Sequence, residues 1–94
     1  MSKYTGKRMK DGCIVTVNEQ PLPLCIDTVN HSPSGFEWGH SDSGSAQLAF
    51  AILHHHFDGD SDKAFHYYQP FKATCLAIID GNKWVITTND IDIF

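Results

Sequence analysis

Long apolar runs are scarce in this sequence of 94 residues. The longest uninterrupted run, Leu48 to Leu53, is far shorter than the ~20 residues that cross a bilayer, so we expect no transmembrane helix and no membrane contact. No apolar stretch follows the basic residues at the start, so we predict no secretory signal. These absences favour a cytoplasmic protein.

Cysteines are few and far apart. Cys13, Cys25 and Cys75 are odd in number and include no C-x-x-C spacing, which argues against a disulfide framework and against a cysteine zinc site. Cysteines without disulfides suit a reducing compartment, where they serve as small buried side chains. They therefore agree with a cytoplasmic location.

Motifs for catalysis and for cofactors are also missing. The sequence contains no G-x-S-x-G nucleophile elbow and neither a G-x-G-x-x-G nor a G-x-x-x-x-G-K-[ST] phosphate loop. Asp27, His31 and Ser32, or His40 with Ser43, supply the residue types of a hydrolase without any such context. We therefore predict a non-catalytic protein that binds no cofactor.

Three histidines, which are common metal ligands, stand in a row at positions 54–56. Neighbouring side chains on a helix point about 100° apart, so three histidines in a row cannot hold one ion from a regular helix. Only a set such as His54, Asp58 and His66 comes near a ligand spacing. We predict no metal site, and a histidine-based metal enzyme remains an alternative.

Basic residues are outnumbered, and the two signs of charge are unevenly distributed. Eleven Asp and Glu against seven Lys and Arg give a formal net charge of −4, while residues 1–10 alone carry +4. The rest of the chain therefore carries −8. Such a body repels phosphate backbones but attracts a basic protein surface, including one that holds nucleic acid.

The N-terminal part of the chain predicts antiparallel strands. Lys3–Lys10 and Cys13–Asn18 flank Asp11-Gly12, a dipeptide typical of a tight hairpin turn. Leu24–Val29 follows two prolines and predicts a third, edge-like strand. These strands would form a small sheet.

Two helices are expected in the second half. Ala46–Phe57 places apolar residues at helical spacing and predicts the central helix, which Gly44 or Ser43 can cap. A second helix begins near Ser61, with Asp60 or the serine itself as its cap.

Pro70 leaves the end of the second helix ambiguous. If the helix stops there, Phe71–Ile79 and Trp84–Thr88 form a hairpin around Asp80-Gly81-Asn82. We favour this hairpin over a continued helix, because an interior proline costs a helix ~3 kcal/mol.

A last short turn is expected at Asp90–Phe94. The sequence thus predicts one α+β domain, residues 1–94, in which an antiparallel sheet with an N-terminal and a C-terminal hairpin packs on two helices.

The most informative segment is the polar stretch of sixteen residues from Asn30 to Ser45. Loops of this length are uncommon inside a compact domain. Phe36 and Trp38 alternate around Glu37, so both rings point to the same side of an extended segment. The rings either plug the core between sheet and helix or form an exposed aromatic patch with polar neighbours, as binding hot spots do.

The stretch from Asn30 to Ala49 reads N-H-S-P-S-G-F-E-W-G-H-S-D-S-G-S-A-Q-L-A. It resembles a family of small bacterial and phage proteins of unknown function, whose corresponding block is N-H-S-P-x-G-F-E-W-G-Y-x-G-S-G-P-A-Q-L-A. This chain differs from that block at His40, Asp42 and Ser45. The resemblance implies a mobile-element context and a helix that continues through Phe71, and it supplies no catalytic or ligand residues.

Phage proteins of this size without cofactor motifs are often inhibitors of host machinery, and the chain is similar to anti-CRISPR proteins in size and acidity. By this analogy we expect a protein in the cytoplasm of a bacterial host that binds a host protein or ribonucleoprotein complex, such as a CRISPR effector. It would occupy the nucleic-acid or partner site of that complex. The predicted partner-binding residues are Glu37, Trp38, His40, Asp42, Asp58, Asp60 and Asp62.

A nucleic-acid accessory protein is the alternative from another class. It would use the basic strand from Lys3 to Lys10, with Tyr4 stacking on a base. Four positive charges are few against the acidic remainder of the chain, so we predict weak nucleic-acid binding at most.

Overall fold

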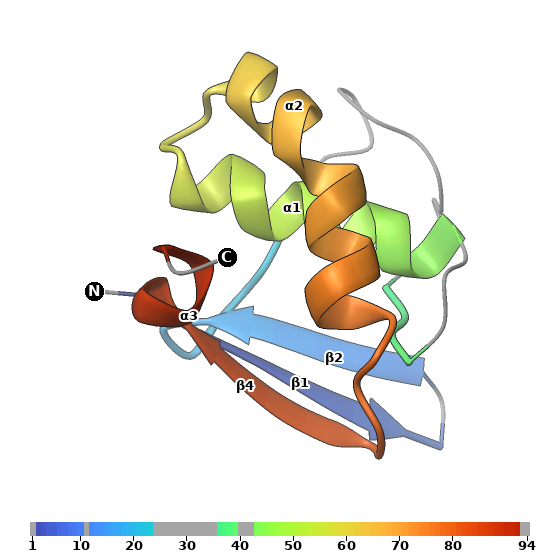
Figure 1. The fold of residues 1–94 in the computed structure, drawn as a ribbon. Helices are drawn as coiled ribbons and strands as arrows, with labels where there is room; N and C mark the ends of the chain where they lie inside the picture. Colours follow the sequence, from blue (N-terminus) through green and yellow to red (C-terminus); the bar gives the residue numbers. More distant parts are fainter. Residues whose placement is uncertain (1, 11, 24–35, 40–42, 93–94) are drawn as a thin grey trace.

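The computed structural model describes residues 2–10, 12–23, 36–39 and 43–92. A four-stranded antiparallel sheet carries a layer of helices on one face (Figure 1), which confirms the α+β prediction. The strand order is β3-β2-β1-β4, so the last strand lies beside the first. In chain order the elements are β1 (Lys3–Met9), β2 (Gly12–Val17), β3 (Gln20–Pro21), α1 (Ser43–His56), α2 (Ser61–Phe71), the π-helical turn η1 (Lys72–Leu76), β4 (Lys83–Thr87) and α3 (Thr88–Asp92).

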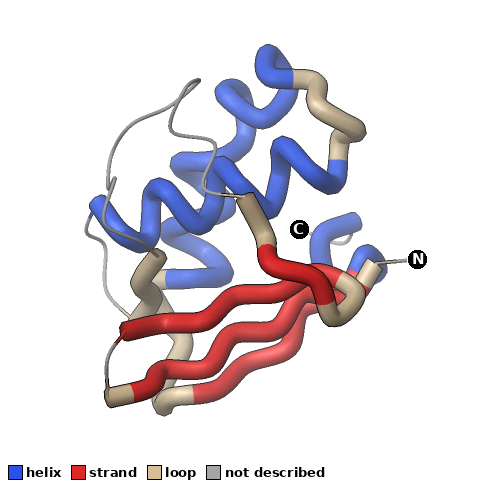
Figure 2. Tube along the Cα trace, turned by 180° about the vertical axis from the view of Figure 1, so that it is seen from behind, coloured by secondary structure: helices blue, strands red, loops and turns tan. Residues whose placement is uncertain are grey.

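The predicted N-terminal hairpin is confirmed. Strand β1 pairs with β2, and Tyr4 lies opposite Val17. Tyr4, Val15 and Val17 are buried, whereas their neighbours along each strand are exposed or half-exposed. The sheet therefore has one face covered by helices and one open face (Figure 2). The third strand predicted at Leu24–Val29 lies outside the described residues.

The predicted C-terminal hairpin is wrong, although its second strand forms as β4. Helix α2 runs through Pro70 to Phe71 and continues as η1, and β4 pairs with β1 instead. The helix continues because Phe71 and Leu76 are buried in the core, and their burial outweighs the hydrogen bond lost at the proline. After Phe71 the helix widens into the π turn, in which the N–H of Ala77 donates to the carbonyl of Lys72 at 2.8 Å. The observed helix is the one that the family resemblance favoured.

Helix α1 runs through the centre of the molecule, as predicted. It begins at Ser43, so Ser43 and Gly44 lie within its first turn rather than capping it. Residues 44–53 are buried without interruption, which makes the buried surface wider than the apolar stripe of the sequence. A helix buried on all sides lies between other layers. Here the sheet lies on one side and α2 on another, where Phe50 and Tyr68 meet edge-to-face with ring centroids 5.6 Å apart (Figure 1).

Side chains cap the starts of α2 and α3. Asp60 caps α2 as predicted, because its carboxylate accepts the N–H of Lys63 at 3.1 Å. Thr87 and Asp90 cap α3 reciprocally: Asp90 Oδ2 accepts the N–H of Thr87 at 2.9 Å, and Thr87 Oγ1 accepts the N–H of Asp90 at 3.4 Å. Helix α3 therefore begins at Thr88, earlier than the turn predicted from Asp90.

Candidate functional site

Trp38, the central aromatic residue of the predicted binding loop, is fully buried. Its Nε1–H donates to the carbonyl of Gly81 at 3.1 Å. Its ring meets Trp84 edge-to-face with centroids 5.6 Å apart, and the guanidinium carbon of Arg8 lies 4.8 Å from a ring centroid. The indole therefore anchors the loop to the sheet and to the turn before β4. The prediction that Trp38 contacts a partner is wrong in this structure, because the ring has no exposed surface.

Glu37 is engaged within the fold by Arg8. Its Oε1 accepts hydrogen bonds from Arg8 Nη2 and, at 3.1 Å, from the backbone N–H of Trp38. Burial raises the pKa of Glu37, but these hydrogen bonds lower it by more, so the pKa lies below its ordinary value. Arg8 Nη1 also donates to Asn82 Oδ1 at 2.9 Å and to the carbonyl of Gly81. Arg8 thus connects β1, the loop and the turn before β4, and it neutralises Glu37.

Some of the other residues of the predicted loop pack against the core, and others lie outside the described residues. Phe36 is half-buried and packs against the core, so both rings of the pair turn inward. Gly44 lies so close to Glu37 that an added Cβ would stand 2.6 Å from the Glu37 Cβ, and only glycine permits this approach of loop and helix. The predicted contacts His40 and Asp42 lie outside the described residues.

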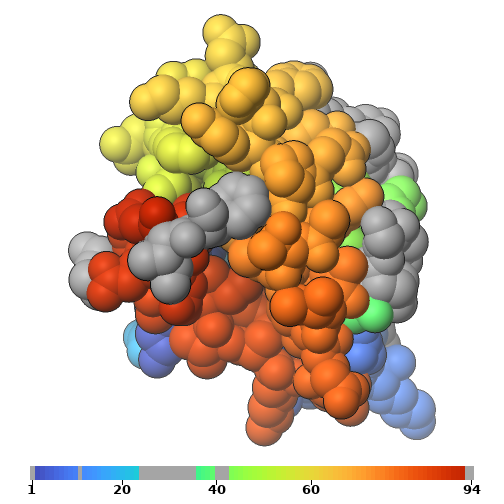
Figure 3. Space-filling model, in the orientation of Figure 1, coloured from blue at the N-terminus to red at the C-terminus, as the bar shows by residue number. Residues whose placement is uncertain are grey.

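The acidic residues that follow α1 are exposed at the surface. Asp58, Asp60 and Asp62, which we call the acidic turn, are all exposed between the end of α1 and the first turn of α2. Asp58 and Gly59 have φ values of 54° and 84°, and the N–H of Gly59 donates to the carbonyl of His54 at 2.8 Å. The acidic turn belongs to the helical layer, away from the sheet, where the yellow atoms project in Figure 3.

The histidines at the end of α1 make contacts within the fold. His55 Nδ1 lies 2.8 Å from Tyr4 Oη, and His56 Nε2 lies 3.3 Å from Asp92 Oδ1. His54 stacks at a tilt on Phe50, with centroids 5.7 Å apart. Across the described ranges, no group of three or more His, Cys, Asp or Glu side chains is placed to hold a metal ion.

Tyr4 does not fit the role that the nucleic-acid alternative gives it. Its ring is fully buried under α1, and its hydroxyl is hydrogen bonded to His55. Burial raises the pKa of Tyr4 to about 12. A ring in this position cannot stack on a base, so this part of the alternative is wrong.

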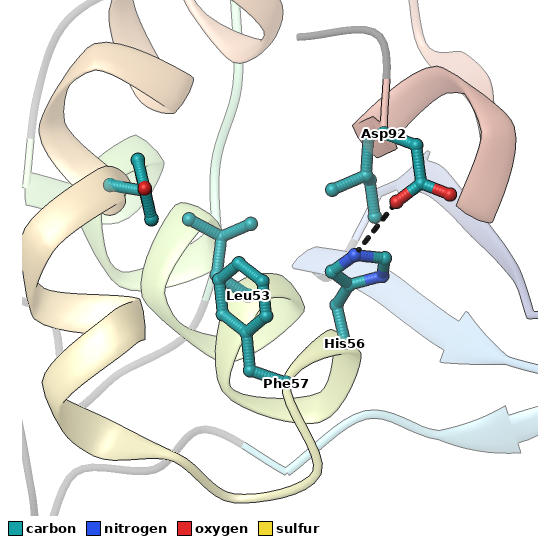
Figure 4. A pocket seen from close by; sticks show the side chains of 6 residues that line it. Leu53, His56, Phe57 and Asp92 are labelled. Carbon is teal, nitrogen blue, oxygen red and sulfur yellow. Dashed lines mark ion pairs between the residues drawn. The ribbon is translucent and has the colours of Figure 1, made fainter.

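An open pocket of about 260 Å³ lies where α1, α2 and α3 meet (Figure 4). His56 and Asp92 point toward each other on one wall, and Leu53 and Phe57 supply apolar surface. The full lining is Leu53, His56, Phe57, Tyr67, Ile91 and Asp92. The pocket therefore offers apolar surface beside the His56–Asp92 contact, and its lining lacks the serine or cysteine nucleophile of a hydrolase.

The model of a family of unknown function, DUF6166, matches residues 4–94, almost the whole chain. The chain belongs to this family. No curated protein and no solved structure matches it. Membership of DUF6166 agrees with the resemblance found at residues 30–49, and the description of the family assigns no activity. None of the helices described for this DUF6166 protein is long and apolar enough to cross a membrane.

Two basic residues have positions that were not predicted. Arg8 is four residues after Tyr4 on β1, so its side chain points to the same, covered face. The alternation that places it there can be read from the sequence. Lys83 joins Lys3 and Lys7 on the open face only through the pairing of β4 with β1, for which the sequence of this DUF6166 protein has no local signal.

Proposed function

We propose that this DUF6166 protein is a non-catalytic binding protein that docks its acidic turn on a basic surface of another macromolecule. The supporting observation is the exposure of Asp58, Asp60 and Asp62 in one short segment. A surface that holds nucleic acid is rich in lysine and arginine, and a carboxylate cluster complements it in charge. The proposed partner is a host defence complex, such as a CRISPR effector, whose nucleic-acid or partner site the protein occupies.

The acidic turn is ordered by its own hydrogen bonds. The N–H of Asp58 donates to the carbonyl of His55, and the N–H of Asp60 to that of Phe57, each at 3.1 Å. The carboxylate of Asp60 is also held by the N–H of Lys63. Because the backbone is already ordered, docking costs little conformational entropy, which supports the acidic turn as a recognition element.

The proposal rests on the acidic turn rather than on the aromatic loop. Trp38 is buried, and Glu37, whose side chain is 35% exposed, is paired with Arg8 within the fold. His40 and Asp42 remain predicted contacts.

A pair of charge-matched variants tests the proposal. Asp58→Asn/Asp62→Asn removes two charges from the acidic turn and keeps the Asp60 cap, whereas Glu19→Gln/Asp80→Asn removes two exposed charges elsewhere. We expect low-salt capture from host lysate to recover a nucleic-acid-binding defence component with the wild type and with the second variant. The first variant should bind the isolated component about 3- to 30-fold more weakly, because two ion pairs are lost. Mass spectrometry identifies the component, and titration measures the affinity.

The nucleic acid of the captured component provides a further measurement. It should displace the protein, because both occupy the same basic surface. Recovery of no defence component at low salt, or an equal loss of affinity in both variants, contradicts the proposal.

A further inference from the structure

The side chains on the open side of the sheet share an unusual composition. Strands β1, β2 and β4 contain no acidic residue. Three exposed lysines on this side accompany threonines and the apolar residues Met9, Ile14 and Val85, which are 44%, 53% and 56% exposed. We call the following part of this side the open sheet face: Lys3, Thr5, Lys7, Ile14, Thr16, Lys83 and Val85.

Two of these lysines face each other across neighbouring strands. Lys7 lies directly opposite Lys83 in the register of β1 and β4. The adjacent pair, Arg8 and Asn82, is hydrogen bonded, so Lys7 and Lys83 form a non-hydrogen-bonded pair, in which the Cα atoms are about 4.5 Å apart. Like charges at such positions destabilise a sheet. An anion bound between the two ammonium groups would offset this repulsion.

We propose that the open sheet face binds the phosphate backbone of single-stranded nucleic acid without sequence preference. Lys3 and Lys7 are four residues apart on β1, about 13 Å in an extended strand, and Lys83 stands beside Lys7. The three lysines therefore lie within about 13 Å along the sheet, within reach of the phosphates of one strand. A duplex presents two rows separated by a major groove about 12 Å wide, of which this set reaches only one. The face carries no aromatic ring, so its contacts are ionic and independent of sequence.

Charge argues against a second copy of the chain as the occupant. A symmetric face-to-face pair would bring the same three lysines of both copies together. The exposed apolar side chains adjoin these lysines, since Ile14 lies opposite Lys7 and Val85 lies two residues from Lys83, so the copies could not bury them without desolvating like charges. The proposal concerns a different face and a different partner from those of the acidic turn, and it goes beyond the proposed function.

A fluorescence-anisotropy titration with a labelled oligothymidylate tests this surface. A plot of the logarithm of the affinity against the logarithm of the salt concentration should have a slope of about −2 for the wild type, because three phosphates on a single strand are neutralised. The affinity should therefore fall about 20-fold on a fourfold increase in salt. Lys7→Gln/Lys83→Gln should reduce the magnitude of this slope by about 1.4. Lys63→Gln/Lys72→Gln, which changes the net charge equally on the helical side, should retain the wild-type slope.

Lys83→Glu separates binding from folding. In this variant Lys7 faces a glutamate in place of a lysine, so a repulsive pair becomes an attractive one. The Tm should therefore rise by about 2–4 °C. The affinity for the oligonucleotide should fall at the same time. A variant that merely disturbed the fold would lose both stability and affinity.

Four results would overturn the proposal. The first two are no binding of the oligonucleotide by the wild type at low salt, and an equal loss of affinity in the two double variants. The other two are tighter binding of a duplex than of the single strand, and lysine-dependent binding to phosphatidylserine vesicles without binding to the oligonucleotide. Capture of a defence component through the acidic turn should be unaffected by Lys83→Glu, so the two proposals fail separately.

Discussion

Glu37 and Arg8 illustrate, at the scale of single residues, how charges expected at the surface become part of the fold. The alternation of β1 places Arg8 on the covered face, where its guanidinium lies over the ring of Trp38 and binds Glu37. The indole of Trp38 is in turn fixed by the carbonyl of Gly81. Glu37 and Trp38 thus position the loop itself, whereas the carboxylates of the acidic turn are exposed.

The Glu37→Gln variant tests the ion pair through its dependence on pH. The pKa of Glu37 is held below the ordinary value of 4.5, so its carboxylate stabilises the fold above that pH. This stabilisation is lost as the pH falls through the lowered pKa. We expect the free energy of unfolding of the wild type, measured with urea, to decrease more steeply than that of Glu37→Gln between about pH 5 and pH 3. Parallel decreases would contradict the role of the pair, and Glu19→Gln serves as the exposed control.

Helix α2 and the turn η1 show, at the scale of elements, that packing overrides local propensity. Pro70 is exposed, and its cost to the helix is local. Phe71 and Leu76 are buried beyond it, and both burials require the chain to stay helical there. The carboxyl end of this helical segment then leads into β4, which becomes the neighbour of β1.

Pro70→Ala measures the local cost of the proline directly. The substitution restores an N–H that can donate to the carbonyl of His66, while the unfolded chain gains some freedom. We expect the free energy of unfolding to rise by about 2–3 kcal/mol, since a cost of about 3 kcal/mol is partly offset by up to about 1 kcal/mol. Urea unfolding measures the change, and Gln69→Ala at the neighbouring exposed position should alter it by less than about 0.5 kcal/mol. A decrease on Pro70→Ala would show that the turn at η1 depends on the proline.

At the scale of the whole molecule, the two proposed binding surfaces lie on different sides. The acidic turn lies in the helical layer, which covers one face of the sheet (Figure 1), and three lysines lie on the open sheet face. Trp38 and Trp84 stand between the layers, in contact with each other. The same core therefore holds both proposed surfaces in place.

Unfolding of the whole chain should be a single cooperative transition. Tryptophan fluorescence reports the junction of sheet and helices, and far-UV circular dichroism reports mainly the helices. Because the two tryptophans belong to the one core that joins the layers, we expect the two urea midpoints to coincide. A helical signal that persists after the fluorescence transition would show that the layers unfold separately.

Local patterns in the sequence determine the N-terminal hairpin, the central helix, the Asp60 cap and the exposure of the acidic turn. Each of these depends on the periodicity or polarity of neighbouring residues, which a short segment carries by itself. Only the tertiary structure decided that residues 71–76 stay helical, that Trp38 turns inward and that Lys83 lies opposite Lys7. Those outcomes depend on contacts between segments far apart in the chain, where the burial gained at a distance outweighs the local preference.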